Sequence, residues 1–235
     1  MRIETITFVY NEEFLIPFYL KHYDFVDQFN ICYDIRSTDR SKKILEENKK
    51  VNLIPVNFPG GWNTMIRQLM IHDVYDTIKD SWVLNIDCDE FAFMDTVPTG
   101  KSDIYRIDFY NVFRHVTETD LDINTPVYQQ RSHGYLDSLY SKPILVKSGQ
   151  VLSWTPGNHF LTNPAIKQDN IPVYCKGAHW ENADLSFCLE RRIKNRRDIQ
   201  SAYNRRMNFG IHNHNITEEQ IVLKCKEHSN DPKIW

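Results

Sequence analysis

Residues 82–93 read WVLNIDCDEFAF, a run of strand-forming residues that leads directly into three acids, Asp87, Asp89 and Glu90. The residues before the acids are mostly large and apolar, which is typical of a buried strand, and apolar residues close in again behind them. Carboxylates in such surroundings repel one another and lose solvation unless a cation or a set of hydrogen-bond donors lies close to them. The stretch therefore predicts a partner for these acids at the end of a buried strand.

The chain has 235 residues, of which 41% are hydrophobic and 13% aromatic, enough for the core of a single globular domain. Its formal charge of −3 gives no overall attraction to nucleic acid or membrane. The five cysteines are scattered and form no C-x-x-C pair, which argues against a disulfide framework and a structural zinc site. The first residues are too polar for a signal peptide and no apolar run is long enough to span a membrane, so we expect a cytoplasmic protein.

Strands and helices alternate over the first ninety residues. The expected strands span residues 3–10, 29–35, 51–56 and 82–86, and the expected helices span 14–23, a segment through Ile44 and Leu45, and 62–78. This order predicts an α/β fold with a mixed, mostly parallel sheet flanked by helices on both faces.

The second half is less regular. We expect strands at 103–113 and 142–146, an irregular polar segment at 117–135 and a helix at 184–206. The predicted organisation is a single domain, 1–235, with a nucleotide-binding half (1–100), a half that completes the acceptor and metal sites (101–183) and a C-terminal helical extension (184–235).

Polar sequences follow three of the expected parallel strands: Asn11-Glu12-Glu13, the loop from Asp34 to Asp39, and the acids at 87–90. Ligands of open α/β sheets bind at the carboxyl ends of strands, so these sequences should line one crevice. Asp87 and Asp89 lie two residues apart on extended backbone and should point the same way. Such oxygen ligands suit Mg²⁺ or Mn²⁺ carrying a diphosphate, although a solvated acidic turn is the alternative.

Three segments, FVYNEEFLIPFYLKHY (8–23), DIRSTDRS (34–41) and residues 62–91 with their W-V-L-N-I-D-C-D-E-F ending, occur in order and at natural spacing. Together they resemble the GT-A nucleotide-sugar glycosyltransferases, particularly the family 2-like and family 92-like members. The resemblance implies a Rossmann-like GT-A fold and a hexosyl- or pentosyltransferase. Such an enzyme would move a sugar from a nucleoside-diphosphate donor with Mn²⁺ or Mg²⁺ as cofactor. A UDP-sugar is the first candidate for this donor.

The resemblance also implies roles for individual residues. Asn11 and Glu12 would lie beside the nucleotide base, Asp34 would bond the base or ribose, and Asp39 would support its loop. The residues expected at the diphosphate and the metal are Arg67 facing the diphosphate, Asp87 at the ribose or a metal-bound water, Asp89 as direct metal ligand and Glu90 bracing the cluster or the acceptor. An ordinary exposed helical arginine is the alternative for Arg67.

Two late histidines, His159 and His179, are candidates for a further metal ligand, because GT-A metal sites commonly include one. A hydrogen-bonded loop histidine is the alternative for each. His212 and His214 alternate in a polar tail and form a weaker metal-binding pattern.

The catalytic base of an inverting transferase would be a carboxylate. Asp137 is the first candidate, and Glu181 and Asp184 are the others. A retaining enzyme needs no such base from the protein.

A basic segment begins at Arg191 and ends at Arg206. It reads as a solvated helix face or as a docking surface for an anionic acceptor, such as a glycan, a lipid-linked sugar or modified nucleic acid. Two other classes of function remain open. An aspartate-based phosphohydrolase also uses D-x-D, but on its first strand, and a non-catalytic sugar-nucleotide or glycan-binding module would tolerate the loss of Asp89.

Overall fold

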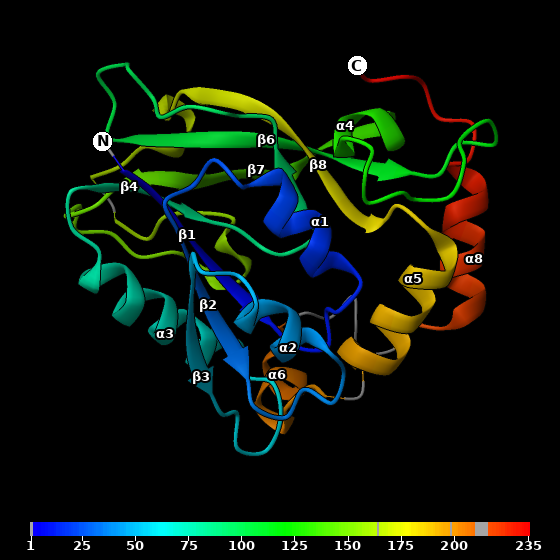
Figure 1. Ribbon diagram of the computed structural model, residues 1–235, viewed down its shortest axis with the longest axis horizontal. Helices are drawn as coiled ribbons and strands as arrows, with labels where there is room; N and C mark the ends of the chain where they lie inside the picture. Colours follow the sequence, from blue (N-terminus) through cyan, green and yellow to red (C-terminus); the bar gives the residue numbers. More distant parts are fainter. Residues whose placement is uncertain (1, 164, 198, 210–215) are drawn as a thin grey trace.

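The computed structural model describes residues 2–163, 165–197, 199–209 and 216–235. Its centre is an eight-stranded sheet in the order β3-β2-β1-β4-β7-β6-β8-β5 (Figure 1). The strands are β1 (Arg2–Val9), β2 (Gln28–Asp34), β3 (Val51–Val56), β4 (Ser81–Asn85), β5 (Glu90–Ala92), β6 (Ile104–Phe113), β7 (His133–Lys147) and β8 (Val173–Asn182). The helices are α1 (Leu15–His22), α2 (Ser41–Glu46), α3 (Thr64–Thr77), α4 (Val127–Gln130), α5 (Leu185–Leu189), α6 (Ala202–Met207) and α8 (Glu218–Glu227).

The first half folds as the alternation of strands and helices predicts. β1 pairs in parallel with β2 and β4, and β2 pairs in parallel with β3. Helix α3 begins where the side chain of Asn63 caps it, with its Oδ1 accepting the backbone N–H of Met65 at 2.9 Å and of Ile66 at 3.2 Å. The predicted α/β class with a mixed sheet flanked by helices is therefore confirmed.

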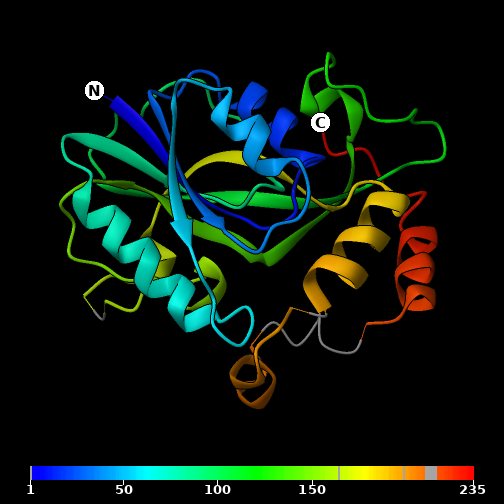
Figure 2. The same cartoon turned by 60° about the horizontal axis from the view of Figure 1, so that its bottom comes forward.

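The two faces of the sheet carry separate hydrophobic clusters. Helices α1 and α2 cover one face and α3 covers the other (Figure 2). Side chains of β1 alternate between them, because Ile3 and Val9 pack with the α1 cluster while Ile6 and Phe8 pack with the α3 cluster. Both faces of β1 are thus buried, and its polar residues Glu4, Thr5 and Thr7 are buried with them.

The second half contains more strand than the sequence predicts. β7 begins at His133, inside the segment expected to be irregular, and pairs antiparallel with β4 and β6. Residues 133–141 are mostly half-buried or exposed, so their polar character hides the strand. β8 was not predicted at all, and it pairs in parallel with β6 and antiparallel with β5. His179 lies within this strand.

The single helix expected at 184–206 is wrong. α5 continues into η3 (Glu190–Arg197), a π-helical segment, and α6 follows separately. Near residue 200 the chain docks on the loop after β3: Trp62 N–H donates to the Ile199 carbonyl at 2.6 Å, and Ser201 N–H donates to the Trp62 carbonyl at 3.0 Å. Ser201 is the N-cap of α6. The hydrogen bonds to Trp62 and this N-cap therefore separate α6 from the helical segment that ends at Arg197.

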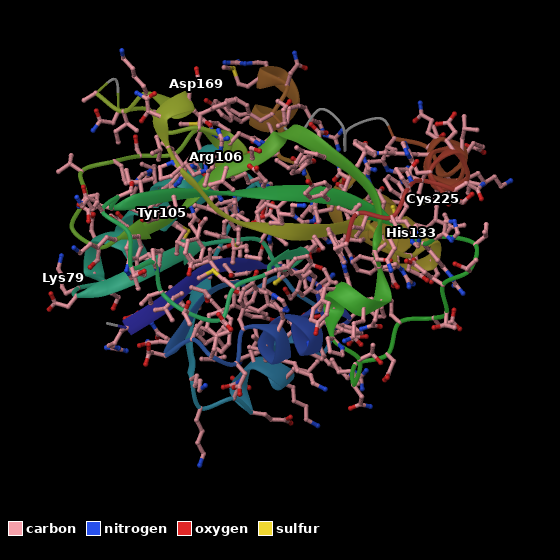
Figure 3. The ribbon with its side chains drawn as sticks, turned by 90° about the horizontal axis from the view of Figure 1, so that it is seen from above. Lys79, Tyr105, Arg106, His133, Asp169 and Cys225 are labelled. Atoms are coloured by element: carbon pink, nitrogen blue, oxygen red, sulfur yellow. The ribbon has the colours of Figure 1, made fainter. Side chains whose placement is uncertain are left out.

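The C-terminal helix α8 falls within the segment expected to be a helical extension, but its bounds were not predicted. It packs beside α5, and Thr217 and Gln220 form a capping box at its first turn. Seen from above, Cys225 of α8 and His133 lie at the opposite end of the molecule from Lys79, just before β4 (Figure 3). The carboxyl ends of β1 and β4 therefore face the side that carries α5 and α8. Among the described residues, no helix has the length and apolar character needed to cross a membrane.

Candidate functional site

The loops after β1 and β2 are tied together by hydrogen bonds. Asn11 adopts a left-handed backbone conformation (φ 50°), and its Oδ1 accepts the Thr38 N–H at 2.8 Å. The Glu12 N–H donates to the Ser41 Oγ at 2.9 Å. Two of the three polar sequences expected at the strand ends therefore meet.

The two aspartates of the loop after β2 have structural partners. Asp34 is fully buried and pairs through both oxygens with Arg36, at 2.9 Å from Nε and 2.6 Å from Nη2. Asp39 accepts the Glu13 N–H at 2.9 Å and the Ser41 N–H at 3.0 Å, which supports the loop as expected of it. Asp34 is therefore committed to an ion pair within its own loop.

Each of the three acids after β4 pairs with a different side-chain cation. One oxygen of Asp87 lies 2.5 Å from Nη2 of Arg67 on α3. Glu90 pairs with Lys142 of β7, and both side chains are almost fully buried. The third acid, Asp89, is also buried and pairs with Nη1 of Arg191 from η3. The partner that the sequence requires for these acids is thus supplied by the chain itself.

These pairs set the charge states of the acids. Burial raises the pKa of Asp89, but Arg191 and His179 outweigh it and hold the pKa well below its usual value. Burial likewise raises the pKa of Asp87, and Arg67 outweighs it. The pKa of Glu90 is raised, because burial exceeds the opposing effect of Lys142. The carboxyl groups of Asp87 and Asp89 are therefore more acidic than usual, and that of the neighbouring Glu90 is less acidic than usual.

Arg191 joins the end of β1 to the end of β4. Its Nε lies 2.9 Å from Oε1 of Glu12, while its Nη1 contacts Asp89. Arg196 adds a second pair to Glu12 at 2.7 Å. Arg191 and Arg192 are each only 4% exposed, so the expectation of a solvated helix face is wrong for this part of the basic segment.

His179 lies beside Asp89, with Nε2 and the Asp89 oxygen 3.3 Å apart. Its other nitrogen, Nδ1, lies 2.7 Å from Oδ1 of Asn111, and the ring of Tyr140 packs against it at 4.3 Å between centroids. Since an amide oxygen only accepts, Nδ1 donates its proton to Asn111, and Nε2 is the ring nitrogen that faces Asp89. Histidine ligands of metals are oriented in this way, so Asp89 and His179 fit a divalent cation as a two-residue donor set.

His159 takes a different position. Its Nδ1 lies 2.5 Å from the Leu139 carbonyl oxygen, and burial lowers its pKa to about 4, so the ring is neutral at pH 7. Within the described part of the chain, no group of three or more His, Cys, Asp and Glu side chains is arranged to hold a metal ion. His212 and His214 lie outside the described residues. The expectation of Mn²⁺ or Mg²⁺ stays a prediction that centres on Asp89 and His179.

The acids and cations surround a cavity of about 130 Å³. Its lining residues are Asp87, Asp89, Glu90, Tyr140, Lys142, Gly157, His159, His179, Glu181, Arg191, Arg192 and Arg196. Four of them are acids and four are lysine or arginine. The cavity can therefore stabilise a ligand that carries several charges.

A second cavity of about 570 Å³ lies on the α1 side of η3. Asn11, Glu12 and Asp39 line it together with the aromatic rings of Phe14 and Phe187. A volume of this size, with aromatic faces and a few polar groups, is typical of a small-molecule site. The residues expected to lie beside a nucleotide base thus share one cavity.

The candidate bases occupy different surroundings. Glu181 lines the smaller cavity and lies 3.8 Å from Nε of Arg192. Asp137 accepts the Leu139 N–H at 3.0 Å and is not among the residues that line this cavity. Asp184 caps α5, accepting the Ser186 N–H at 3.0 Å. The structure therefore places Glu181, rather than Asp137, beside the acids and cations.

Sequence reasoning missed the lining residues Tyr140 and Lys142, and it considered Arg192 only as part of the basic segment. Lys142 is the only charged residue of the strand expected at 142–146. A lysine on a buried strand needs an acid as partner, and the acids at 87–90 need a cation, so this shared need is the signal that could have found it.

No known protein-family model matches the sequence, and no curated protein matches it significantly. Several solved structures show some likeness, and three of them illustrate its extent. A crystal structure of S. aureus TarS residues 1–349 aligns at TM-score 0.34 and 18% identity, over 63% of this chain and 47% of that one. The same fragment in complex with UDP aligns at TM-score 0.37 and 16% identity, over 94% and 77%. The CTP:phosphocholine cytidylyltransferase LicC of Streptococcus pneumoniae aligns at TM-score 0.32 and 14% identity, over 63% and 69%. The chain thus spans about half of the first of these structures, and likeness of this extent assigns no activity.

Proposed function

We propose that this protein is a glycosyltransferase of the GT-A type, which transfers a sugar from a nucleoside-diphosphate donor to an acceptor hydroxyl. A UDP-sugar is the first candidate for the donor. One observation carries the proposal: Asp87, Asp89 and Glu90 converge with Lys142 and the η3 arginines on one cavity at the carboxyl ends of parallel strands. Charged ligands of open α/β sheets bind at this end of the sheet.

The cations of the cavity suit a leaving diphosphate. When the bond between the anomeric carbon and the β-phosphate oxygen breaks, negative charge grows on the diphosphate. Arg192 lines the cavity and would neutralise part of that charge. Guanidinium groups match phosphate oxygens well, because they present two parallel N–H donors.

Asp89 and His179 would hold the Mn²⁺ or Mg²⁺, which would take its other ligands from diphosphate oxygens and water. Such a cation supplies additional positive charge to the diphosphate as it leaves. Asp87 would remain with Arg67, which fixes it beside the cluster.

Glu181 is the proposed base. It would accept the proton of the acceptor hydroxyl while that oxygen forms the new bond to the anomeric carbon. Its position in the lining of the cavity supports this role over that of Asp137. An anionic acceptor would meet Arg205 and Arg206, which are exposed on α6.

A thermal-shift series tests the proposal. UDP, other nucleoside diphosphates and their sugar conjugates are added with and without Mn²⁺ to the wild-type protein and to Asp89→Asn and Glu181→Gln. At a ligand concentration 100 times Kd the stabilisation is about 2.7 kcal/mol, which for a chain of this size is a rise in Tm of about 5–11 °C.

We expect Asp89→Asn to remove the Mn²⁺-dependent part of the rise, and Glu181→Gln to keep the rise while losing sugar transfer. If no nucleoside diphosphate raises the Tm, the proposed function is wrong. If Glu181→Gln retains full transfer, Glu181 is not the base.

A further inference from the structure

Arg191 lines both cavities. The smaller one, at about 130 Å³, has the volume of about four water molecules, which is far below the size of a small-molecule site. The larger one, at about 570 Å³, has room for a nucleoside. A nucleoside-diphosphate sugar that places its base in the larger cavity and its diphosphate in the smaller one must pass the side chain of Arg191.

The guanidinium of Arg191 forms the wall between the cavities. Its Nε contacts both oxygens of Glu12, at 2.9 and 3.1 Å, and its Nη1 contacts Asp89 on the other side. The group also lies over the ring of Phe187, at 5.8 Å from the ring centroid. This side chain therefore links the end of β1 to the end of β4 and lies between Glu12, which lines the larger cavity, and Asp89, which lines the smaller one.

The charged side chains that line the smaller cavity balance one another. The acids are Asp87, Asp89, Glu90 and Glu181, and the cations are Lys142, Arg191, Arg192 and Arg196. Four negative and four positive formal charges sum to zero, so an arriving diphosphate competes with the carboxylates for these cations.

Arg191 can leave its carboxylates at lower cost than Lys142 can leave Glu90. Glu12 would keep Arg196 at 2.7 Å, and Asp89 would keep His179 at 3.3 Å. In contrast, moving Lys142 would take the close cation partner from the buried Glu90.

We propose that Arg191 exchanges partners when a nucleoside diphosphate binds. Its guanidinium moves from Asp89 to the diphosphate, the two cavities join, and Asp89 becomes available to a divalent cation. Arg191 is thus both a ligand of the diphosphate and an internal competitor of the metal. This inference rests on the proposed function and assigns a role to one residue within it.

Binding of Mn²⁺ without nucleotide tests the competition directly. Free Mn²⁺ is followed by electron paramagnetic resonance during titration of wild-type protein and of Arg191→Gln. We expect the variant to bind Mn²⁺ more tightly by about 5- to 150-fold, the usual range of coupling between sites. Adding Asp89→Asn to Arg191→Gln should abolish the gain, because the gain arises at Asp89.

Binding of metal-free UDP tests the other half of the exchange. By calorimetry, Arg191→Gln should bind UDP at least about tenfold more weakly than wild type, since a cation that contacts the diphosphate is lost. The matched control is Lys194→Gln on the same segment. The side chain of Lys194 is 71% exposed and lies 3.8 Å from Glu190. This control should match wild type in both titrations.

Arg191→Lys is measured in parallel, because it keeps a positive charge and protects the fold if Arg191→Gln is unstable. A single ammonium cannot contact both Glu12 and Asp89 as the guanidinium does, so the same two changes are expected at smaller size. Unchanged Mn²⁺ and UDP affinities in these variants would overturn the role of Arg191 alone. Failure of wild-type protein to bind UDP with or without Mn²⁺ would instead refute the proposed function.

Discussion

Replacing Lys142 with methionine should strongly destabilise the protein. Lys142 and Glu90 form an ion pair in which the side chains are 3% and 1% exposed. Methionine has a similar length and fills the same space, but it leaves the Glu90 carboxylate buried without its cation. The substitution therefore isolates the charge of Lys142 from its volume.

The expected loss follows from this burial. Removing one partner of a buried ion pair costs about 3–5 kcal/mol. For a chain of this size, 1 kcal/mol shifts the Tm by about 2–4 °C, so we expect a decrease of about 6–20 °C. Adding Glu90→Gln to Lys142→Met should restore most of the loss, because it removes the unpaired charge.

The loss should also depend on pH. The pKa of Glu90 is raised in the folded protein by burial, against the opposing effect of Lys142, and should rise further without that lysine. A raised pKa favours folding below the unfolded value of 4.5, and this contribution is lost as the pH rises through the folded pKa. The deficit of Lys142→Met should therefore be smaller near pH 5 than near pH 8.

Chemical denaturation at both pH values measures these changes. The control is Lys42→Met, since Lys42 pairs with Glu46 at 3.5 Å on the surface with both side chains more than half exposed. Its effect should stay within about 0.5 kcal/mol. A loss below about 1 kcal/mol for Lys142→Met, or a loss that Glu90→Gln leaves unchanged, would refute the reasoning.

Three further predictions concern other parts of the structure. Burial lowers the pKa of His159 from 6.5 to about 4, so the contribution of the neutral ring to stability is present above pH 6.5 and lost as the pH falls toward 4. Denaturation between pH 7 and pH 4 should therefore show that the free energy of unfolding depends less on pH in His159→Gln than in wild type. A Cβ on Gly61 (φ 108°) would lie 2.6 Å from the Ile199 carbonyl oxygen, so Gly61→Ala should lower the free energy of unfolding by about 1–3 kcal/mol. It should also speed hydrogen exchange at the Trp62 amide, which donates to that carbonyl. Gly60→Ala is the control, because there is open space around Gly60 and the exchange at Trp62 should stay unchanged. Removing the cap of α3 by Asn63→Ala should cost about 0.5–2 kcal/mol in urea denaturation, and a neutral result would show that the cap is dispensable.

The elements of the first half could be predicted from the sequence because periodicity and turn residues agree there. The predicted strand at 51–56 matches β3, and the predicted strand at 82–86 matches β4 to within one residue. In the second half the same reasoning fails at β7, because its first residues extend beyond the core and alternate weakly. The expected helix at 184–206 fails because contacts with the loop after β3, which lies far away in sequence, end it.

The acids of the candidate site and Arg67 could be proposed from the sequence, but the pairing of Lys142 and Arg191 with those acids could not. Asp87, Asp89 and Glu90 follow a recognisable strand, and His179 was one of two histidines considered beside them. Lys142 and Arg191 lie about 50 and 100 residues further along the chain from their acidic partners, as the pairs Lys142–Glu90 and Arg191–Asp89 show. Sequence spacing carries no information about such contacts, and a basic run ordinarily indicates a solvated face.

The distribution of charge along the chain makes the site a product of the whole fold. The first hundred residues supply four of its acids and one cation, namely Glu12, Asp87, Asp89 and Glu90 with Arg67. The later residues supply Glu181 with the cations Lys142, Arg191, Arg192 and Arg196. Since a buried acid without a cation costs several kcal/mol, the first half is stable in this arrangement only when β7 pairs with β4 and η3 reaches the strand ends. Any ligand that draws an arginine of η3 away from its acid therefore acts on the contact that holds η3 to the sheet, and binding at the site is coupled to the position of this segment.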